Sequence, residues 1–568
     1  MRKPAELAFL FFERLRPGDW QRTLAWAALV GMAGALATLG FRAGLVQIER
    51  LLYGSNGGLV HAAQSLPWWL RLLAPVVGGA LAGTVLMLAR RLPRSPHGDY
   101  MEAIVLGRGE LPVRNSLLRA LSSACTVASG GAIGREGPMV QLAALTGSLV
   151  GAWARMPVAR RRLLVACAAA AGLATAYSAP VAGALFIAEI VLQSLATETL
   201  AALLIASVSA HATVVALVGA EPLYRMPAVP LPATSVLVAA GLVGLLAGLG
   251  APLYLWLLDL AKSAFGAWPA ALPWKLAAGG LVVGLISVRM PQVWGNGFSV
   301  VSGILQGGWA WQALVLVLVL KVAAVAATTG SGAVGGIFTP TLFVGAASGA
   351  LAASAASALF GHALPVSAGA AVGMGAFLAA STHAPLTSVL MIFEMTEDYD
   401  LVAPLMLACV LAYSVSRLLR PESIYASSQR AKAATDPRVA TARDLLRPES
   451  ITAHPGDSIA EVERRLLESR WRHVYVVDAQ GLFRGAISMH DLATVLKAPH
   501  EPGTPWPADL LQPDYPRLAL DMPLWEVLHV FETHPGERLP VLDDAGRLQG
   551  HVAKTDLVLM LRDRLALG

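Results

Sequence analysis

Hydrophobic and polar positions divide the chain near residue 425. Of the 43 Lys+Arg and 37 Asp+Glu, 37 lie in the last 143 positions, about 26% of that stretch, and 43 lie in the first 425, about 10%. A soluble protein cannot cover its surface with so few charges. Residues 1–425 are therefore predicted to form a membrane domain, and the rest a soluble one.

Two stretches carry no Asp, Glu, Lys or Arg: residues 226–258 and residues 322–393. One span needs about 20 residues, so the longer stretch must fold into several segments. Both are rich in Gly, Ser, Thr and Pro, which let helices pack closely. Broken helices around a protein-enclosed pathway are predicted; a bundle of merely kinked helices is the alternative.

Two landmarks of the membrane domain occur twice in the same order. They are Ser129–Pro138 and Ser331–Pro340, 202 positions apart, and Ala179-Pro180 with Glu189 and Ala384-Pro385 with Glu394, 205 positions apart. Duplicated halves are predicted at about 30–220 and 230–420. Interrupted helices in paired halves are typical of transporters with a site near the membrane midplane, and an inverted relation between the halves is expected.

The soluble part also repeats. Gly485–Leu492 resembles Gly550–Leu557 at an offset of 65, and each follows a β-rich run. Each unit reads as helix, strand, turn, strand, helix. This α/β pattern resembles a tandem pair of cystathionine-β-synthase (CBS) domains. The predicted boundaries are a linker at 426–440 and CBS domains at 441–498 and 506–566.

The two glycine-rich loops carry the candidate chemistry. Each places glycines before a helix start, where N–H groups lack intrahelical partners and carry positive partial charge. Two such loops meeting in a membrane would bind a small anion without a lysine in the pore. A cation site would want converging carboxylates, and the loops offer only Glu136.

Glu136 is a carboxylate in an apolar stretch, which makes it a functional candidate. When ionised, its side chain can mimic the anion and plug the site; when protonated, it can swing away. Anion passage would then depend on pH. A structural salt bridge from Glu136 to an arginine is the alternative.

Gly-Arg-Glu-Gly-Pro at 134–138 and Gly-Ile-Phe-Thr-Pro at 336–340 resemble two signature motifs of the CLC chloride channel and chloride/proton antiporter family. Ser178–Gly183 and the CBS tail agree. The resemblance implies a homodimer with one anion pathway per subunit and Glu136 as the gating glutamate. The residues that it implies for chloride binding are Arg135, Gly137, Ile337, Phe338 and, through its hydroxyl, Tyr425, which is otherwise an interfacial anchor.

Two positions depart from the family pattern. The best counterpart of its serine motif is His97–Glu102, which puts Gly98 at the serine position without a hydroxyl, beside Asp99, a helix N-cap candidate. Family exchangers carry an inner glutamate where this chain has Ile190, which cannot relay a proton. Glu189 reads as a structural carboxylate. A passive channel is therefore favoured over an exchanger.

The CBS pair resembles modules that bind an adenine nucleotide. Ser488 and Asp491 suit phosphate and ribose contacts, whereas the second unit keeps Asp556 and has Ala553 at the serine position. One nucleotide site at most is predicted. A purely structural dimerising module is the alternative.

The sequence as a whole predicts a mostly α-helical, polytopic membrane protein that passes chloride under the control of pH and voltage. A chloride/proton antiporter is the first alternative, a fluoride-selective member of the family the second, and a membrane-anchored nucleotide sensor the third. No enzyme motif occurs, and neither a required cofactor nor a nucleic-acid partner is predicted. Basic clusters beside apolar segments follow the positive-inside rule, no signal peptide is predicted, and both termini are expected in the cytoplasm. The Ala-rich and Arg-rich composition and a tail without an organelle signal favour a bacterial inner membrane.

Overall fold

The computed structural model describes residues 19–54, 58–90, 99–105, 107–219, 221–227, 233–360, 365–425, 441–469, 471–497, 503–534 and 536–565. The chain forms two compact units, Met1–Gln429 and Arg430–Gly568. The predicted linker at 426–440 and the predicted anion ligand Gly98 lie outside the described residues.

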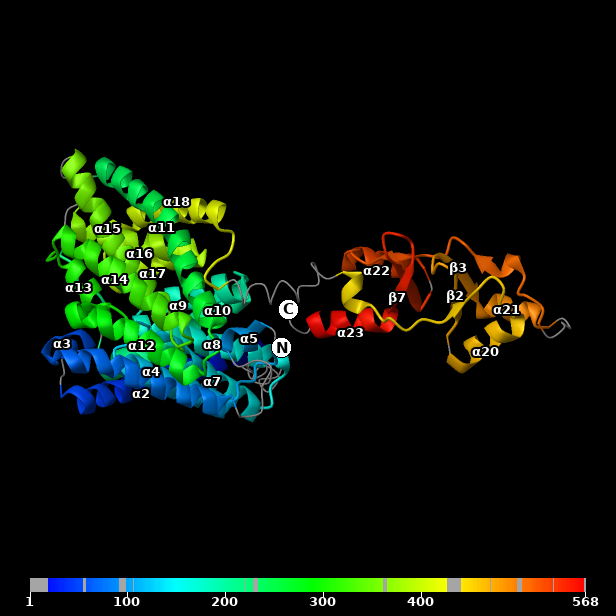
Figure 1. Ribbon diagram of the computed structural model, residues 1–568, viewed down its shortest axis with the longest axis horizontal. Coiled ribbons are helices and arrows are strands. Elements are labelled where there is room, and N and C mark those ends of the chain that lie inside the picture. Colours follow the sequence, from blue (N-terminus) through cyan, green and yellow to red (C-terminus); the bar gives the residue numbers. More distant parts are fainter. Residues whose placement is uncertain are drawn as a thin grey trace, which may run out of the picture. The chain divides into compact units, whose positions relative to one another are not determined.

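The first unit is built of helices (Figure 1). The helices of its first half are α2 (Asp19–Tyr53), α3 (Leu59–Ser65), α4 (Trp68–Ala89), α5 (Tyr100–Val105), α6 (Val113–Ala128), α7 (Glu136–Trp153), α8 (Val158–Tyr177), α9 (Pro180–Phe186), the π-helical turn η1 (Ile187–Leu192) and α10 (Thr197–Val218). Those of its second half are α11 (Ala233–Ala267), α12 (Leu272–Arg289), η2 (Pro291–Val293), α13 (Phe298–Leu305), α14 (Trp311–Gly330), α15 (Phe338–Phe360), α16 (Val366–Thr382), α17 (Pro385–Thr396), η3 (Tyr399–Leu401) and α18 (Val402–Leu419).

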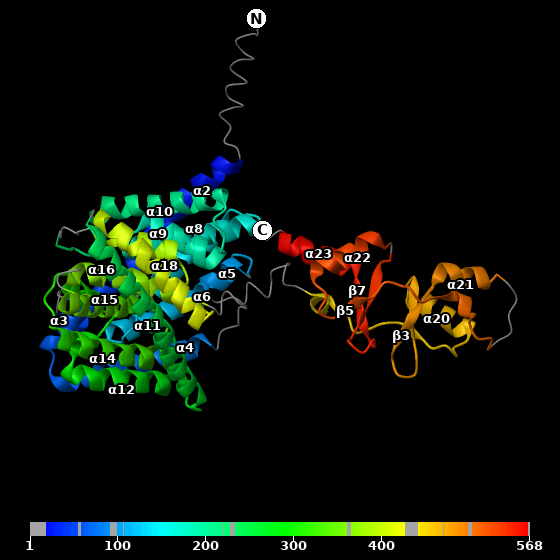
Figure 2. The ribbon, with the colours of Figure 1, turned by 90° about the horizontal axis from the view of Figure 1, so that it is seen from above.

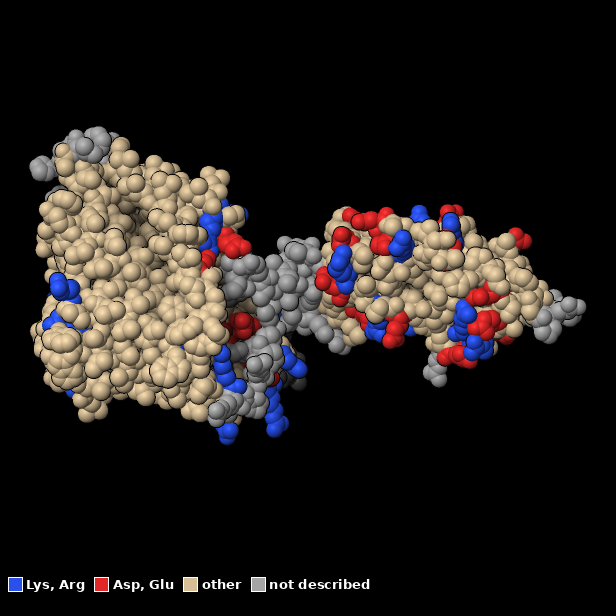
Figure 3. Space-filling model, in the orientation of Figure 1, with Lys and Arg blue, Asp and Glu red and all other residues tan. Residues whose placement is uncertain are grey.

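Within the described part of the chain, eight helices are long and apolar enough to cross a membrane: α2, α4, α10, α11, α12, α14, α15 and α18. Shorter apolar helices lie between them, namely α9 with η1, α16 and α17. The face of this unit in Figure 3 carries its charged side chains at its margins, with a broad uncharged surface between them. The predicted polytopic fold with broken helices is therefore confirmed.

Reciprocal contacts relate the two halves by a two-fold axis. A Cβ atom at Gly79 of α4 would lie 2.4 Å from the carbonyl oxygen of Leu276 in α12, and one at Gly280 of α12 would lie 2.0 Å from the carbonyl of Pro75 in α4. Gly280 follows Gly79 by the same number of positions as Leu276 follows Pro75, because a two-fold axis repeats each contact with the partners exchanged. The packing of α2 on α10 in the first half recurs in the second half as the packing of α11 on α18; Figure 2 shows α2 and α10 together at one margin.

The repeated glutamates connect the halves in the same reciprocal way. Glu189 follows α9 and accepts hydrogen bonds from the Thr387 backbone N–H (2.8 Å) and hydroxyl (2.6 Å) in the first turn of α17. Glu394 of α17 accepts from the N–H groups of Val181 (2.9 Å) and Ala182 (2.8 Å) in the first turn of α9. Each carboxylate thus caps the helix N-terminus of the other half.

The second unit holds two small sheets, in the strand orders β1-β2-β3-β4 and β5-β6-β7. Its elements are η4 (Ala442–Leu445), β1 (Thr452–Ala453), α20 (Ile459–Ser469), β2 (His473–Val477), β3 (Phe483–Ser488), α21 (Met489–Val495), η5 (Ala508–Leu510), β4 (Leu511–Gln512), β5 (Leu518–Ala519), α22 (Leu524–Thr533), β6 (Arg538–Leu542), β7 (Leu548–Ala553) and α23 (Lys554–Leu565). In both repeats a parallel strand pair is followed by an antiparallel one.

The two tail repeats exchange their leading segments. β4, near the start of the second repeat, pairs with β3 of the first. Arg447, near the start of the first repeat, pairs with His551 in β7 of the second. Glycines permit both pairings: a Cβ at Gly485 would lie 2.5 Å from the Gln512 carbonyl oxygen, and one at Gly550 2.2 Å from that of Arg447. The predicted α/β tandem is therefore confirmed as an intertwined pair.

Candidate functional site

The two glycine-rich loops meet directly. The Gly134 N–H donates to the Gly336 carbonyl oxygen (2.7 Å), and the Gly336 N–H donates to that of Gly134 (2.8 Å). A Cβ atom at Gly335 would lie 2.7 Å from the side chain of Ile133, so the loops approach too closely for larger residues. Because Gly134 and Gly336 are counterparts in the repeated loops, these two hydrogen bonds also follow the two-fold relation between the halves.

A helix begins directly after each loop. α7 starts at Glu136 and α15 at Phe338. The amides of a first helical turn have no intrahelical acceptor and concentrate positive partial charge there. Because the loops are hydrogen-bonded to each other, both helix starts border one space, which can bind an anion through backbone donors.

This space is a cavity of about 650 Å³. It brings together five predicted site residues from both halves and from the segment after α18: Glu136, Gly137, Ile337, Phe338 and Tyr425. Arg135 is half-buried and precedes α7 without lining the cavity.

Aromatic rings form one wall of the cavity. Tyr425 packs edge-on against Phe186 with ring centroids 5.6 Å apart, and Tyr177 packs on Phe338 at 4.8 Å. The hydroxyls of Tyr177 and Thr339 share a hydrogen bond of 3.1 Å. The segment that carries Tyr425 is held by a bond from the Ile424 N–H to the Ser381 carbonyl oxygen (2.9 Å). This wall is therefore fixed from both halves.

Glu136 lies where the loops meet and is only 6% exposed. Its Oε1 accepts a hydrogen bond from the side-chain amide of Asn296 (2.9 Å). Its Oε2 is buried and has no hydrogen-bond partner among the described residues. Within the same part of the chain, no arginine pairs with the Glu136 carboxylate, as the salt-bridge interpretation would require.

Polar residues also line the cavity. Asp99 accepts from the Met101 N–H (2.9 Å) and so caps α5, the role that the sequence offered for it. The Asp99 carboxylate lies 3.9 Å from the Arg119 guanidinium. Gln141 of α7 accepts from the Tyr100 N–H (3.0 Å), which ties the start of α5 to α7.

Ile190, at the position of the family's inner glutamate, is 4% exposed and belongs to the apolar core. The carboxylate of the preceding residue, Glu189, is engaged by Thr387 at the start of α17. Neither side chain lines the cavity.

Two residues near this site were not predicted from the sequence. Lys321 is fully buried in α14 and donates to the carbonyl oxygens of Val293 and Gly295, each at 2.7 Å. Asn296 follows these residues and reaches Glu136. The signal for Lys321 was present, because the charge-free stretch 322–393 begins directly after it. Asn296 stands between two glycines and gives no signal of its own.

In the tail, each predicted nucleotide-binding side chain has a partner within the protein. The Ser488 hydroxyl accepts from the His490 N–H (3.1 Å) and caps α21. The Asp491 carboxylate accepts from the Gln512 side chain (2.8 Å). The Asp556 carboxylate pairs with the guanidinium of Arg447, whose pKa this hydrogen bond raises.

Comparisons with known proteins agree with this architecture. The family model described as voltage gated chloride channel matches residues 78–417, and the CBS domain model matches 442–498 and 508–563. The chain is 52% identical over 410 residues to the ClcB-like protein of Ralstonia nicotianae, which covers 71% of this chain and 95% of the relative. It is 42% identical over 417 residues to the voltage-gated ClC-type chloride channel ClcB of Salmonella typhimurium, which covers 71% and 98%.

Solved structures show the same fold. A slow cyanobacterial Cl⁻/H⁺ antiporter aligns with a TM-score of 0.64 and 26% identity, over 72% of this chain and 98% of that one. A eukaryotic CLC transporter aligns with a TM-score of 0.60 and 19% identity, over 94% and 98%. The chain is therefore a multi-pass membrane protein that belongs to the CLC family of voltage-gated chloride channels and transporters and carries a tandem CBS tail.

Proposed function

We propose that this protein lets chloride pass through the cavity down its gradient, and that Glu136 is the gate. The observation that carries the proposal is the position of the Glu136 carboxylate, buried in the cavity where the helix starts of α7 and α15 converge. An ionised carboxylate competes with chloride for the same backbone amides. A protonated one does not, so acidification opens the pathway.

Chloride would be held by backbone N–H groups and one hydroxyl. In this proposal the amides of Ile337 and Phe338 and the Tyr425 hydroxyl bind an inner chloride, and the amides at Arg135 and Gly137 bind an outer one. It is supported by the presence of Gly137, Ile337, Phe338 and Tyr425 in the lining of the cavity. Backbone dipoles bind an anion without the full charge of a lysine, which favours release as well as entry. Gly98 supplies no hydroxyl, so the inner position rests on fewer donors.

Passive flow is favoured over proton exchange by the surroundings of position 190. Ile190 cannot carry a proton, and Glu189 is held by the first turn of α17. The relatives described as voltage-gated chloride channels agree with this choice. The cyanobacterial Cl⁻/H⁺ antiporter of the same fold makes an antiporter the second candidate. The Gly98 position leaves a fluoride carrier as the third.

We further propose a homodimer in a bacterial inner membrane with both termini in the cytoplasm, without enzymatic activity or a required cofactor. The tail either binds one adenine nucleotide, through Ser488 and Asp491, or serves only as a structural module. At Asp556 a nucleotide would have to displace Arg447.

The test is chloride efflux from proteoliposomes with external pH recorded in parallel, with the membrane potential set by valinomycin. We expect chloride efflux without uphill proton movement, and flux in Glu136→Gln that no longer depends on pH. Proton uptake driven by the chloride gradient would establish the antiporter. Unchanged pH dependence in Glu136→Gln would overturn the gating role, and fluoride efflux without chloride efflux would establish the fluoride carrier.

A further inference from the structure

The geometry points to Asn296 as a positioning residue that holds the Glu136 side chain in the closed pathway, with Lys321 as the anchor of the loop that carries it. This inference rests on the proposed gating role of Glu136. It assigns the protein's own hydrogen-bond partner for the gate, in a loop that lies outside both signature motifs.

The orientation of the Asn296 amide is fixed by its two neighbours. Its side-chain oxygen accepts from the Phe298 N–H at the start of α13 (3.2 Å). Its side-chain nitrogen donates to Glu136 Oε1 (2.9 Å). The backbone N–H can only donate and the carboxylate can only accept, so a reversed amide would lose both bonds.

The loop around Asn296 is held by hydrogen bonds from Lys321 and to Gly130. The Lys321 ammonium, fully buried, bonds to the carbonyl oxygens of Val293 and Gly295 at 2.7 Å each and lies 5.5 Å from the centroid of the Phe343 ring. The Gly295 N–H donates to the Gly130 carbonyl oxygen at 3.3 Å. Asn296 is thereby fixed relative to the first glycine-rich loop.

Close packing of Trp294 strengthens this attachment. Its ring is fully buried, and a Cβ atom at Gly130 would lie 2.3 Å from it. Gly130 can accept the ring because it has no side chain and adopts a positive φ of 95°. The Asn296 loop therefore cannot move without the loop that leads to Glu136.

The charged and titratable groups around Glu136 leave Asn296 as its direct partner among the described residues. Three phenols interact with the carboxylate through space without a hydrogen bond to it, and Arg135 precedes it in the chain. The phenols are Tyr177, Tyr224 and Tyr425. Asp99, Glu102 and Arg119 line the same cavity, and none of these described residues has a hydrogen bond or ion pair with Glu136. Lys321 donates to the two carbonyl oxygens instead.

A neutral amide donor favours an ionised acceptor over a protonated one, because charge-assisted hydrogen bonds are the stronger kind. Asn296 therefore stabilises the blocking form of Glu136. Asn296→Asp keeps the oxygen that caps α13 and replaces the donor by a second carboxylate. Two adjacent carboxylates favour protonation of one of them, so this variant should open at higher pH.

The experiment measures chloride efflux from proteoliposomes between pH 4.5 and 8.5 for the full chain and for Asn296→Asp, Asn296→Leu and Glu136→Ala. We expect the pH of half-maximal efflux to rise by about one unit, a tenfold change in proton affinity, in Asn296→Asp. A smaller rise is expected in Asn296→Leu, which loses both hydrogen bonds without adding charge. Combined with Glu136→Ala, neither substitution should change the pH profile.

Asn115→Asp is the matched control, because it makes the same amide-to-carboxylate change on α6 at a residue that does not line the cavity. An equal rise of the midpoint pH in Asn115→Asp would show that the added negative charge alone causes the shift, and would overturn the role of Asn296. An unchanged midpoint in Asn296→Asp, together with pH-independent flux in Glu136→Ala, would overturn this inference alone. Persisting pH dependence in Glu136→Ala would overturn the gate itself.

Discussion

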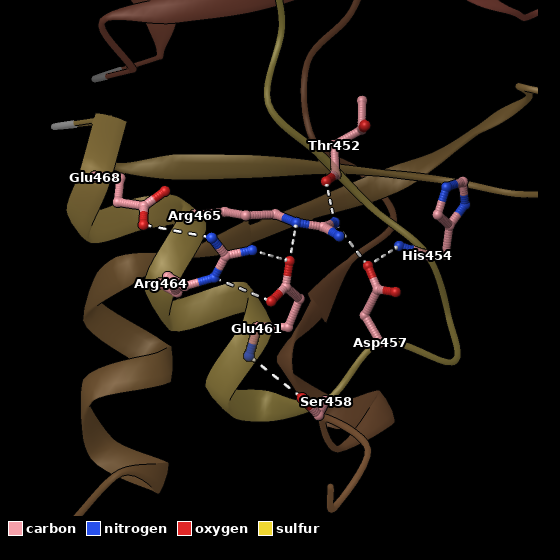
Figure 4. A network of polar contacts seen from close by, with 8 residues as sticks. All are labelled: Thr452, His454, Asp457, Ser458, Glu461, Arg464, Arg465 and Glu468. Atoms are coloured by element: carbon pink, nitrogen blue, oxygen red, sulfur yellow. Dashed lines mark hydrogen bonds and ion pairs between the residues drawn. The ribbon is translucent and has the colours of Figure 1, made fainter.

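Charged side chains have different kinds of partner in the membrane unit and in the tail. In the membrane unit, Lys321 and Glu189 bond to backbone carbonyls, amides or a hydroxyl of other elements. In the tail, acidic and basic side chains gather on the surface of α20, where Arg464 and Arg465 share Glu461 (Figure 4). Figure 3 shows the same contrast between an uncharged face and a mixed one.

The difference follows from the surroundings of each charge. Water solvates a surface ion pair whether or not it forms, so each pair contributes little to stability. A charge in an apolar interior must be satisfied locally, and removal of its partner leaves a buried polar group without a hydrogen bond. Buried charges in this protein therefore fix tertiary structure, whereas surface pairs mainly keep the tail soluble.

The largest effect is expected at Lys321. Lys321→Met would leave the Val293 and Gly295 carbonyl oxygens without a donor, which costs about 1–3 kcal/mol for each group, offset in part because no ammonium need be buried. Thermal unfolding of the purified protein in detergent should show a lower melting temperature. Lys275→Met, on α12 at a position that is not buried, is the control. Equal stability of the two variants would contradict the anchoring role.

The next largest effect is expected at the reciprocal helix caps. Glu189→Ala and Glu394→Ala should each destabilise the protein by about 1–2 kcal/mol, as loss of a helix cap does. Glu189→Ala should have the greater effect, because it also leaves the Thr387 hydroxyl without its acceptor. Melting temperatures would be compared with that of Glu198→Ala, an exposed residue of α10. A lower melting temperature in only one of the two variants would contradict the equivalence of the two caps.

A smaller effect is expected on the stability of the tail when the pH is lowered. Burial, assisted by the charge of Arg538, lowers the pKa of His551 from 6.5 to about 4. The folded tail therefore binds fewer protons than the unfolded one between these values, so stability is complete above pH 6.5 and falls as the pH drops towards 4. The loss between pH 7 and pH 5.5 is about 1 kcal/mol.

Hydrogen exchange of peptides that cover β6 and β7 should therefore accelerate on acidification, after correction for the intrinsic effect of pH. The acceleration should weaken in His551→Gln and persist in His529→Gln, whose imidazole is exposed on α22. Identical profiles for the two variants would exclude His551 as the source.

The smallest effects are expected from substitutions on α20, where two neighbouring arginines should differ. Arg464 contacts only Glu461 and Glu468 among the described residues, and all three side chains are solvated, so Arg464→Ala should leave the exchange rates of the tail unchanged. Arg465 also donates to the Thr452 carbonyl oxygen and to Asp457, each at 2.8 Å. Arg465→Ala should therefore accelerate hydrogen exchange in β1. A larger acceleration in Arg464→Ala than in Arg465→Ala would contradict the view that only bonds to other elements stabilise the tail.

The sequence was sufficient for the features that repeat. The scarcity of charge up to residue 425 predicted the membrane unit, and the motifs that recur at constant spacing predicted the duplicated halves and the tandem tail. Repetition is visible without coordinates because each repeat must satisfy the same local geometry. Glycine before a helix start and proline within its first turn are local requirements of this kind.

Only the tertiary structure decided which groups meet. At the spacing of the glycine-rich loops, Asn296 corresponds to Arg94 and Lys321 to Arg119, so the repeat gave no sign that an amide or a buried ammonium would serve Glu136. The exchange of Arg447 and β4 between the tail repeats was equally invisible, because strand pairing across repeats depends on chain crossing and not on local preference. The sequence thus determined the elements and the family, whereas the partners of the buried charges were set by long-range packing, in which each polar group must find a partner where water is excluded.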